Sequence, residues 1–283
     1  MKKFIKLISA TLLALSLVAC AKSEEAKPAE TTTTEKTSET LKVSATLDPH
    51  STILEFAKPI LKEKYNIDLE IQVLDDYYVF NKALDSGEVD ANYFQHVPFF
   101  NGEVEANGYK ISNVAGIHIE PFGFYSKTIK SVDEIKDKAK VVISNSVADH
   151  GRILSILEKA GLIKLAAGVD ALTATTKDIV ENPKNLTFIE VKPELLTISF
   201  ENNEGDLVAI NGNYAIQAGL NPTKDAVIIE QADSTNPYVN IVACKQGHEN
   251  DEKIKALVEV LKSAEVKEFI QKTWADGSVI PAE

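Results

Sequence analysis

Arginine is almost absent from this chain of 283 residues: Arg152 is the only one, and the other 29 of the 30 basic residues are lysines. A guanidinium group is planar, always charged and able to hold a carboxylate through two parallel N–H bonds, which an ammonium group cannot do. The single arginine therefore marks a position where this geometry can matter. The alternative interpretation is that Arg152 is a surface cation paired with Asp149, which lies one helical turn earlier.

Cysteine is also scarce, with only Cys20 and Cys244 in the sequence. Cys20 lies at the end of the N-terminal segment 1–20, which leaves Cys244 alone in an apolar stretch, residues 238–244. The chain therefore offers no structural disulfide, and Cys244 is predicted to be a buried, inert thiol.

Positive charge is in short supply as well. Without residues 1–19 the chain loses three lysines, so its net charge becomes 27 − 42 = −15, which excludes nucleic acid as a partner. The motifs G-x-S-x-G and H-E-x-x-H and a Gly-rich phosphate loop are all missing, so we expect no enzyme. No two histidines share helical ligand spacing, so no metal site or cofactor is predicted; the histidines are His50, His96, His118, His150 and His248. Two interpretations of the protein's function remain open as alternatives: a metal-binding component of an importer and a surface adhesin.

The first 40 residues predict export and anchoring. A basic start precedes the 13-residue apolar run 7–19, which is too short to span a bilayer, so residues 1–19 are a signal peptide. The run ends in Leu-Val-Ala-Cys and resembles a bacterial lipobox, which makes Cys20 the lipidated N-terminus; the alternative is an ordinary secretory signal. Residues 20–40 form the lipid anchor and a disordered tether, because residues 21–40 contain six threonines and five glutamates but no aromatic or branched aliphatic residue.

From residue 41 onward, apolar stretches of strand and helix character alternate. The first set has strands at 41–46, 68–74, 89–93 and 111–119 with helices at 52–64, 77–84 and 97–107. The second has strands at 140–144, 186–191, 207–210 and 226–229, with helices from 148, 193 and 214; a strand at 238–244 and helices at 251–263 and 265–274 follow. Such repeats predict an α/β protein with mostly parallel sheets. We expect two lobes, residues 41–119 plus 240–283 and residues 120–239, with a ligand cleft between them.

Several polar residues stand where the predicted strands end. Arg152 lies in a helix that follows the strand 140–144, in a strand–turn–helix arrangement that often binds anions. Alternation places Phe94 and His96 on one side of their strand. Asn211 directly follows the strand 207–210, where a turn or cap role is the alternative, and Asn240 interrupts an apolar strand, where its amide must find a partner.

Several segments together resemble the NlpA family, the methionine-binding lipoproteins of bacterial ABC importers. They are DANYFQH (90–96), GYK (108–110), YSKTIKS (125–131), EKAGLIKL (158–165), ENPKNL (181–186), INGNYA (210–215) and PYVNI (237–241). The resemblance implies a two-lobed periplasmic-binding-protein fold that closes on a small amino acid, with an ABC permease and ATPase as partners. It also implies a protein anchored to the cell membrane on its extracytoplasmic side. Around the ligand side chain it places Tyr77, Phe94, His96 and Phe99; for the carboxylate and amino groups it implies Arg152, Asn211 and Asn240.

The segment before the arginine departs from the family pattern. Where the family commonly reads PNDPTNxGR, residues 144–152 read SNSVADHGR, so Asp149 replaces an amide with a charge and His150 is unusual. Phe99 stands where a tyrosine is frequent. The expected ligand is methionine, and D-methionine, a short methionyl peptide or another apolar amino acid remain alternatives.

Overall fold

The structure, a computed structural model, describes residues 38–232 and 236–282. The predicted signal peptide, Cys20 and all but the end of the predicted tether lie outside the described residues. The first strand, β1 (Glu39–Ala45), begins two residues earlier than predicted. Its start is paired with the next strand, since Glu39 lies opposite Ile67.

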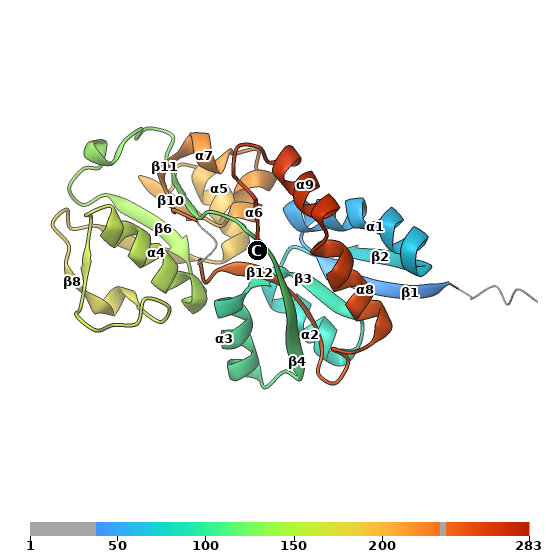
Figure 1. Ribbon diagram of the computed structural model, residues 1–283. Helices are drawn as coiled ribbons and strands as arrows, with labels where there is room; N and C mark the ends of the chain where they lie inside the picture. The colour runs from blue at the N-terminus through green and yellow to red at the C-terminus, as the bar shows by residue number, and fades with distance from the viewer. Residues whose placement is uncertain (1–37, 233–235, 283) are drawn as a thin grey trace, which may run out of the picture. The chain divides into compact units, whose positions relative to one another are not determined.

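The larger of two main sheets combines the N-terminal third of the chain with its C-terminal end (Figure 1). Its strand order is β13-β4-β12-β3-β1-β2, and the strands after β1 are β2 (Ile67–Val73), β3 (Ala91–His96), β4 (Ile111–Ile119), β12 (Val239–Lys245) and β13 (Ile280–Pro281). Its helices are α1 (Thr52–Tyr65), α2 (Tyr77–Ser86), α3 (Val97–Asn107), α8 (Glu252–Leu261) and α9 (Ala264–Thr273). A short turn, η1 (Leu47–Ser51), links β1 to α1.

The two faces of this sheet pack against different helices. Along β12, Val242 and Cys244 belong to the core formed with α1, α8 and α9, whereas Ile241 and Ala243 pack with residues of α2 and α3. This alternation follows from the period of two in a strand. Cys244 is fully buried and burial raises its pKa to about 11, so the prediction of a buried thiol is confirmed.

The smaller sheet has the order β11-β5-β10-β6-β9. Its strands are β5 (Gly123–Tyr125), β6 (Lys140–Ser144), β9 (Thr187–Val191), β10 (Leu207–Ile210) and β11 (Ala226–Ile229). Its helices are α4 (Val147–Lys159), α5 (Leu196–Glu201), α6 (Gly212–Gln217) and α7 (Pro222–Asp225), with short turns η2 (Val132–Glu134), η3 (Thr176–Asp178) and η4 (Pro193–Leu195). A two-stranded sheet, β7 (Lys164–Leu165) and β8 (Ile179–Glu181), is attached to this lobe.

The prediction of mostly parallel sheets is wrong. The β1–β2, β1–β3, β6–β9 and β6–β10 pairs are parallel, but β4, β12 and β13 pair antiparallel in the larger sheet, as β5 and β11 do in the smaller one. The chain leaves the larger sheet after β4 and returns as β12. These connections bring strands in without the helical crossover that makes a parallel pair.

Apolar side chains from both lobes also meet each other. Tyr77, Phe80, Phe94 and Phe99 from the larger sheet's elements pack in one cluster with residues from the smaller one, among them Leu196 and Tyr214. The lobes are therefore joined over a buried aromatic surface, next to which the polar strand ends lie.

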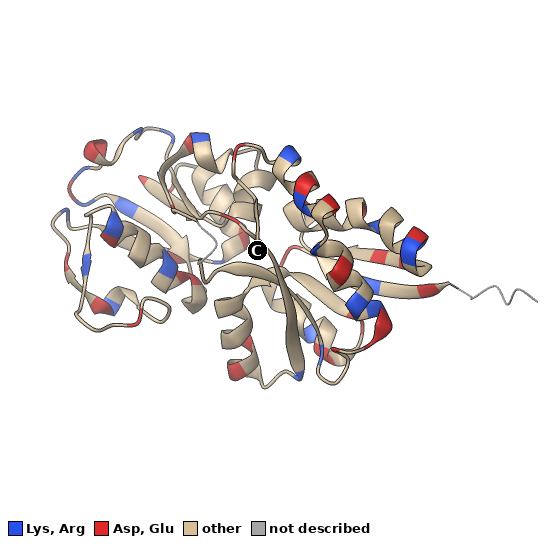
Figure 2. Cartoon of the chain, viewed as in Figure 1, with Lys and Arg blue, Asp and Glu red and all other residues tan. Residues whose placement is uncertain are grey.

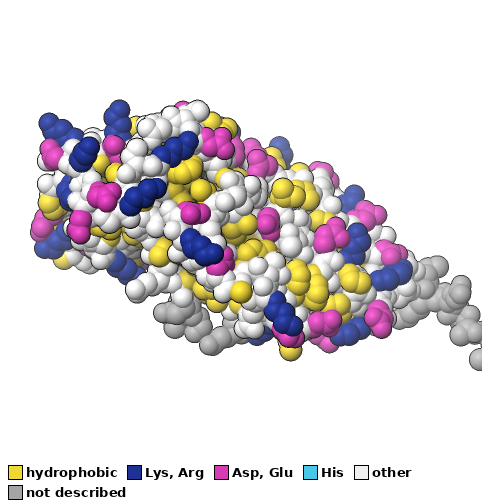
Figure 3. Space-filling model, turned by 90° about the horizontal axis from the view of Figure 1, so that it is seen from above, with side chains coloured by type: hydrophobic (Ala, Val, Ile, Leu, Met, Phe, Trp, Pro, Cys, Tyr) yellow, Lys and Arg dark blue, Asp and Glu magenta, His cyan; other side chains and the backbone are white. Residues whose placement is uncertain are grey.

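Charged residues lie mainly outside these cores. Along α1, α8 and α9, acidic and basic positions are interspersed (Figure 2), and the face drawn in Figure 3 likewise mixes both signs. Within residues 38–232 and 236–282, no helix is both long and apolar enough to cross a membrane.

Candidate ligand-binding site

All seven residues predicted for the ligand site line one cavity between the two sheets. These are Tyr77, Phe94, His96, Phe99, Arg152, Asn211 and Asn240, and the wall is completed by Gln95, Glu120, Asp149, Gly212 and Asn213. The space free of protein atoms amounts to about 370 Å³, including the part that is open to solvent. Every residue that lines the cavity is buried, so the cavity is enclosed in this structure.

Aromatic rings form the apolar wall. The ring centroid of Tyr77 lies 6.0 Å from that of Phe94, 5.8 Å from Phe99 and 5.0 Å from Tyr214. Tyr77 opens α2 and its hydroxyl donates to Asn213 Oδ1 at 2.5 Å. Such a wall suits an unbranched apolar side chain or a thioether, because sulfur packs well against aromatic ring edges.

Phe94 and His96 both line the cavity, and Gln95 between them lines it as well, so the cavity lining does not show the expected alternation. His96 also caps α3, because its Nδ1 accepts from the backbone N–H of Phe99 at 3.2 Å. The other ring nitrogen of His96, Nε2, lies 3.4 Å from Asp149 Oδ1.

Arg152 is only 4% exposed, so the surface-cation alternative is wrong. Its Nε and Nη2 donate to Glu230 Oε1 and Oε2 at 3.0 and 2.6 Å, and Nη2 also donates to the backbone oxygen of Glu120 at 2.7 Å. The guanidinium group lies 4.4 Å from the ring centroid of Tyr238. The two-bond grip expected of this arginine is therefore made with the chain's own Glu230, which fixes the guanidinium at the edge of the cavity.

Asp149 is buried and contacts other groups than Arg152. Its Oδ1 lies 3.4 Å from both His96 Nε2 and Asn211 Nδ2. Burial alone would raise the pKa of Asp149, but the hydrogen bond from His96, with help from Ser144 and Arg152, lowers it below its usual value. The cavity thus carries a carboxylate here. His150 does not line it and instead bonds the backbone oxygen of Ser144 at 2.9 Å.

Two amide groups of the cavity wall each have one hydrogen-bonding atom that is not used within the described part of the chain. Within the described part of the chain, Asn211 Oδ1 and Asn213 Nδ2 are buried atoms without a hydrogen-bond partner. Asn211 precedes α6, but its side chain makes no cap bond, so the cap alternative is not realised. Leaving a buried polar atom unpaired costs about 1–3 kcal/mol. One unpaired acceptor and one unpaired donor among the residues that line the same cavity indicate a site for a ligand that has both kinds of group.

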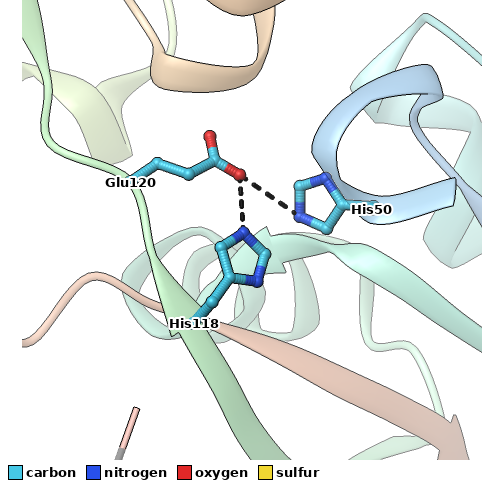
Figure 4. Close-up of side chains that lie close together, drawn as sticks. All are labelled: His50, His118 and Glu120. Atoms are coloured by element: carbon cyan, nitrogen blue, oxygen red, sulfur yellow. Dashed lines mark hydrogen bonds and ion pairs between the residues drawn. The ribbon is translucent and has the colours of Figure 1, made fainter. Parts of the chain in front are cut away.

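Glu120 is the main polar group that the sequence analysis missed. It follows β4 directly and is 5% exposed, and its Oε1 lies 2.8 Å from His118 Nε2 and 3.6 Å from His50 Nε2 (Figure 4). Burial raises its pKa. A Cβ added at Gly212 would lie 2.6 Å from the Cβ of Glu120, so only glycine fits there. The position of Glu120 directly after an apolar strand is the same signal that pointed to Asn211.

The raised pKa of Glu120 gives a stability prediction. A folded-state pKa above the unfolded value means that the native state gains stability below the unfolded pKa and loses it as pH rises through the folded pKa. We therefore expect Glu120→Gln to raise the melting temperature of the ligand-free protein at about pH 7.5, and this gain to vanish at about pH 3.3, one unit below the pKa of about 4.3 that unfolded glutamate has. Thermal melts of both proteins at the two pH values check this, and a Glu120→Gln protein that melts lower at neutral pH would contradict it.

His50, His118 and Glu120 also have the composition of a metal site. One donor atom from each lies within 4.8 Å of the others (Figure 4), although the two histidines are far apart in the sequence. Two ligands of a tetrahedral zinc ion with bonds of about 2.0–2.1 Å would stand about 3.3 Å apart. The 2.8 Å between His118 Nε2 and Glu120 Oε1 is instead a hydrogen-bond length. The geometry fits an imidazole–carboxylate hydrogen bond better than a metal centre.

An enclosed polar cavity between two α/β lobes, with an aromatic wall on one side, defines the class of two-lobed substrate-binding proteins. The particular family follows from comparison with known proteins. The chain belongs to the NlpA lipoprotein family, whose model matches residues 41–283. This confirms the family resemblance and the fold class that the sequence predicts.

Individual relatives agree with this assignment. The methionine-binding lipoprotein MetQ of Bacillus subtilis is 52% identical over 240 residues, 84% of this chain and 86% of the relative. A periplasmic substrate-binding protein of an ABC transporter from Coxiella burnetii has a structure with a TM-score of 0.80 at 37% identity, covering 86% of this chain and 100% of that one. The structure of a nutrient binding protein from Burkholderia cenocepacia bound to methionine gives a TM-score of 0.81 at 37% identity, with the same coverage.

Proposed function

We propose that this protein captures methionine, or a closely related small amino acid, outside the cytoplasm and delivers it to an ABC importer. The observation that carries the proposal is the convergence of seven residues from distant parts of the chain on one enclosed cavity. The names of the relatives and the methionine-bound structure among them support the ligand. The ABC-transporter relative supports a permease and ATPase as partners.

The polar groups of the cavity match the two charged ends of an amino acid. Asn213 Nδ2 is an unpaired donor, and Asn240 and Arg152 bring further N–H groups for the carboxylate. Asn211 Oδ1 and the carboxylate of Glu120 are acceptors for the ammonium group. The ligand side chain then lies against the aromatic wall, which is formed by Tyr77, Phe94 and Phe99 with His96.

The cavity has a second carboxylate, that of Asp149, so more than one form of the ligand fits the proposal. Asp149 can accept an amine that Glu120 does not reach, which would favour D-methionine, a methionyl peptide or another apolar amino acid over L-methionine. Mass spectrometry of the small molecule released by denaturing the purified protein decides between them. Recovery of methionine supports the proposal, and recovery of a metal ion or a different class of metabolite would overturn it.

We further propose lobe boundaries at residues 41–119 plus 240–283 and 120–239. The strands of each main sheet come from one of these lobes, with two exceptions. The exceptions are Val239, the first residue of β12, and Glu39–Thr40 of β1. Parting of the lobes along the buried aromatic cluster would open the cavity. Tyr214 Oη, which donates to the backbone oxygen of Asp75 at 2.7 Å, is one contact that would break.

The anchor is proposed to be a lipid on Cys20, which is consistent with the lipoprotein family. Replacing Cys20 by alanine should release the protein from membranes and leave ligand affinity unchanged, because the cavity lies wholly within the folded part. Cell fractionation followed by calorimetry checks both. Cys244→Ala is the matched control and should stay on the membrane; retention of the Cys20→Ala protein there would refute lipid anchoring.

A further inference from the structure

Two chains of hydrogen bonds lie behind the cavity wall, and the first ends on Glu120. The hydroxyl group of Tyr93, a fully buried residue of β3, is bonded to His118 Nδ1. On the other side of the ring, His118 Nε2 lies 2.8 Å from Glu120 Oε1. Tyr93 and His118 do not line the cavity, so they act on it only through Glu120.

The second chain ends on Asn240. Thr46 Oγ1 lies 2.6 Å from His50 Nδ1, and His50 Nε2 lies 3.1 Å from Asn240 Oδ1. Thr46 and His50 are fully buried and also stand outside the cavity lining. The two imidazole rings are neighbours, with centroids 4.8 Å apart, so the chains form one buried cluster.

The protonation of both rings follows from their surroundings. Burial lowers the pKa of His50 and of His118 to about 3, so each ring is neutral at physiological pH and carries one N–H. Each Nε2 faces oxygen acceptors, namely Glu120 Oε1 for His118 and Asn240 Oδ1 with Glu120 Oε1 for His50. The hydrogen must therefore sit on Nε2 in both rings, and each Nδ1 accepts from a hydroxyl group.

We propose that these two chains are positioning elements that give the cavity its polarity: the Tyr93–His118 chain aims Glu120 as an acceptor for the ligand's ammonium group, and the Thr46–His50 chain turns the NH2 of Asn240 toward the ligand's carboxylate. Because Asn240 Oδ1 is taken by His50, only the Nδ2 donor of this amide is free to face the cavity. Gly212 leaves the space that this placement of Glu120 needs, because a Cβ added there would lie 2.6 Å from Glu120 Cβ and 2.9 Å from Oε2. This inference deepens the proposed function and rests on it.

The tautomers can be measured without any ligand. Long-range proton–nitrogen NMR spectra should show His50 and His118 as neutral rings with the hydrogen on Nε2. Finding either ring charged, or with the hydrogen on Nδ1, would overturn the positioning role whether or not the protein binds methionine. A failure of the proposed function is thereby kept separate from a failure of this inference.

Ligand discrimination tests the two chains in turn. Tyr93→Phe and Thr46→Val each remove one hydroxyl group that lies outside the cavity. The probes are L-methionine, its des-amino analogue 4-methylthiobutanoate and L-methioninamide, and dissociation constants come from calorimetry. Tyr93→Phe should reduce the preference for methionine over the des-amino analogue about tenfold, and Thr46→Val should reduce the preference over the amide to a similar extent, as expected for one charge-assisted hydrogen bond.

The matched control is Tyr125→Phe. Tyr125 is also a buried tyrosine, but within the described residues its hydroxyl group has no hydrogen-bond partner, so its removal should leave both preferences unchanged. If Tyr93→Phe and Thr46→Val weaken the binding of all three probes in equal proportion, the two hydrogen-bond chains only support the fold, and the positioning role is wrong. Wild-type protein that binds none of the probes would refute the proposed ligand, while the NMR result still decides the hydrogen-bond arrangement.

Discussion

Replacing Arg152 by alanine is expected to lower ligand affinity by on the order of 2–5 kcal/mol, the range found when one partner of a buried charge pair is truncated. Arg152→Lys should already lose most of the affinity, because an ammonium group cannot satisfy Glu230 Oε1, Glu230 Oε2 and the backbone oxygen of Glu120 together. Displaced from that position, the charge no longer faces the ligand. Calorimetric titration of both variants measures the effect.

A stability loss should accompany the loss of affinity. Glu230 is buried with 8% of its side chain exposed, and Arg152 together with backbone and side-chain bonds holds its pKa below the usual value despite burial. Without its partner the carboxylate stays buried and uncompensated, at a cost of about 3–5 kcal/mol. The depressed pKa also means that this contribution is present above the usual glutamate pKa and is lost as pH falls through the folded value.

A second variant separates the two effects of Arg152. Glu230→Gln breaks the ion pair but keeps the guanidinium group in the cavity wall, so it should lower stability while ligand affinity is kept or increased. Wild-type affinity in Arg152→Lys or Arg152→Ala would show that the arginine serves only to pair with Glu230. The ligand carboxylate would then be held by the asparagine amides alone.

The second large effect is expected from the ligand itself. L-Methionine at about 100 times its dissociation constant should stabilise the protein by roughly 2.7 kcal/mol and raise its melting temperature. Norleucine should do so less, because it lacks the sulfur that packs against the aromatic wall. Aspartate, lysine and divalent zinc should have no effect. A thermal-shift panel compares them, and a zinc-dependent shift would restore the metal interpretation of His50, His118 and Glu120.

Asp149→Asn belongs in the same panel. It replaces the carboxylate by the amide that the family resemblance leads us to expect, and it removes one of the two cavity carboxylates. If L-methionine binds through Glu120 alone, the variant should bind it as well as or better than the wild type. If Asp149 holds the amine of a D-isomer or a methionyl peptide, the variant should lose those ligands selectively. A panel in which only another amino acid shifts the transition would leave the site in place and refute the ligand.

Local patterns predicted most of the helices and strands. The helix Val97–Asn107 and the strand Ile111–Ile119 begin and end where the sequence places them, because Pro98 and Gly108 mark the helix ends. The strand before them was predicted to end at Tyr93, but it continues to His96 because β12 pairs with it as far as Asn240. Pairing between distant segments is not written in the local pattern.

The same limit applies to the site. Arg152 stands out by composition, but its partner Glu230 lies 78 residues away, and the sequence suggested Asp149 instead. His50 and His118 were read as isolated histidines because spacing along the chain was the only measure of clustering. Three-residue strands such as Gly123–Tyr125 were missed because so short an apolar stretch has no detectable period.

We propose that the cavity takes a free amino acid with an apolar, thioether-containing side chain. The most direct measurement is a calorimetric titration of L-methionine into protein that has been unfolded, dialysed free of bound small molecules and refolded. A one-to-one saturable binding curve that is weakened in Arg152→Lys and in Glu120→Gln is the predicted result. Refolded wild-type protein that gives no heat with L-methionine, D-methionine or methionyl peptides would contradict the account.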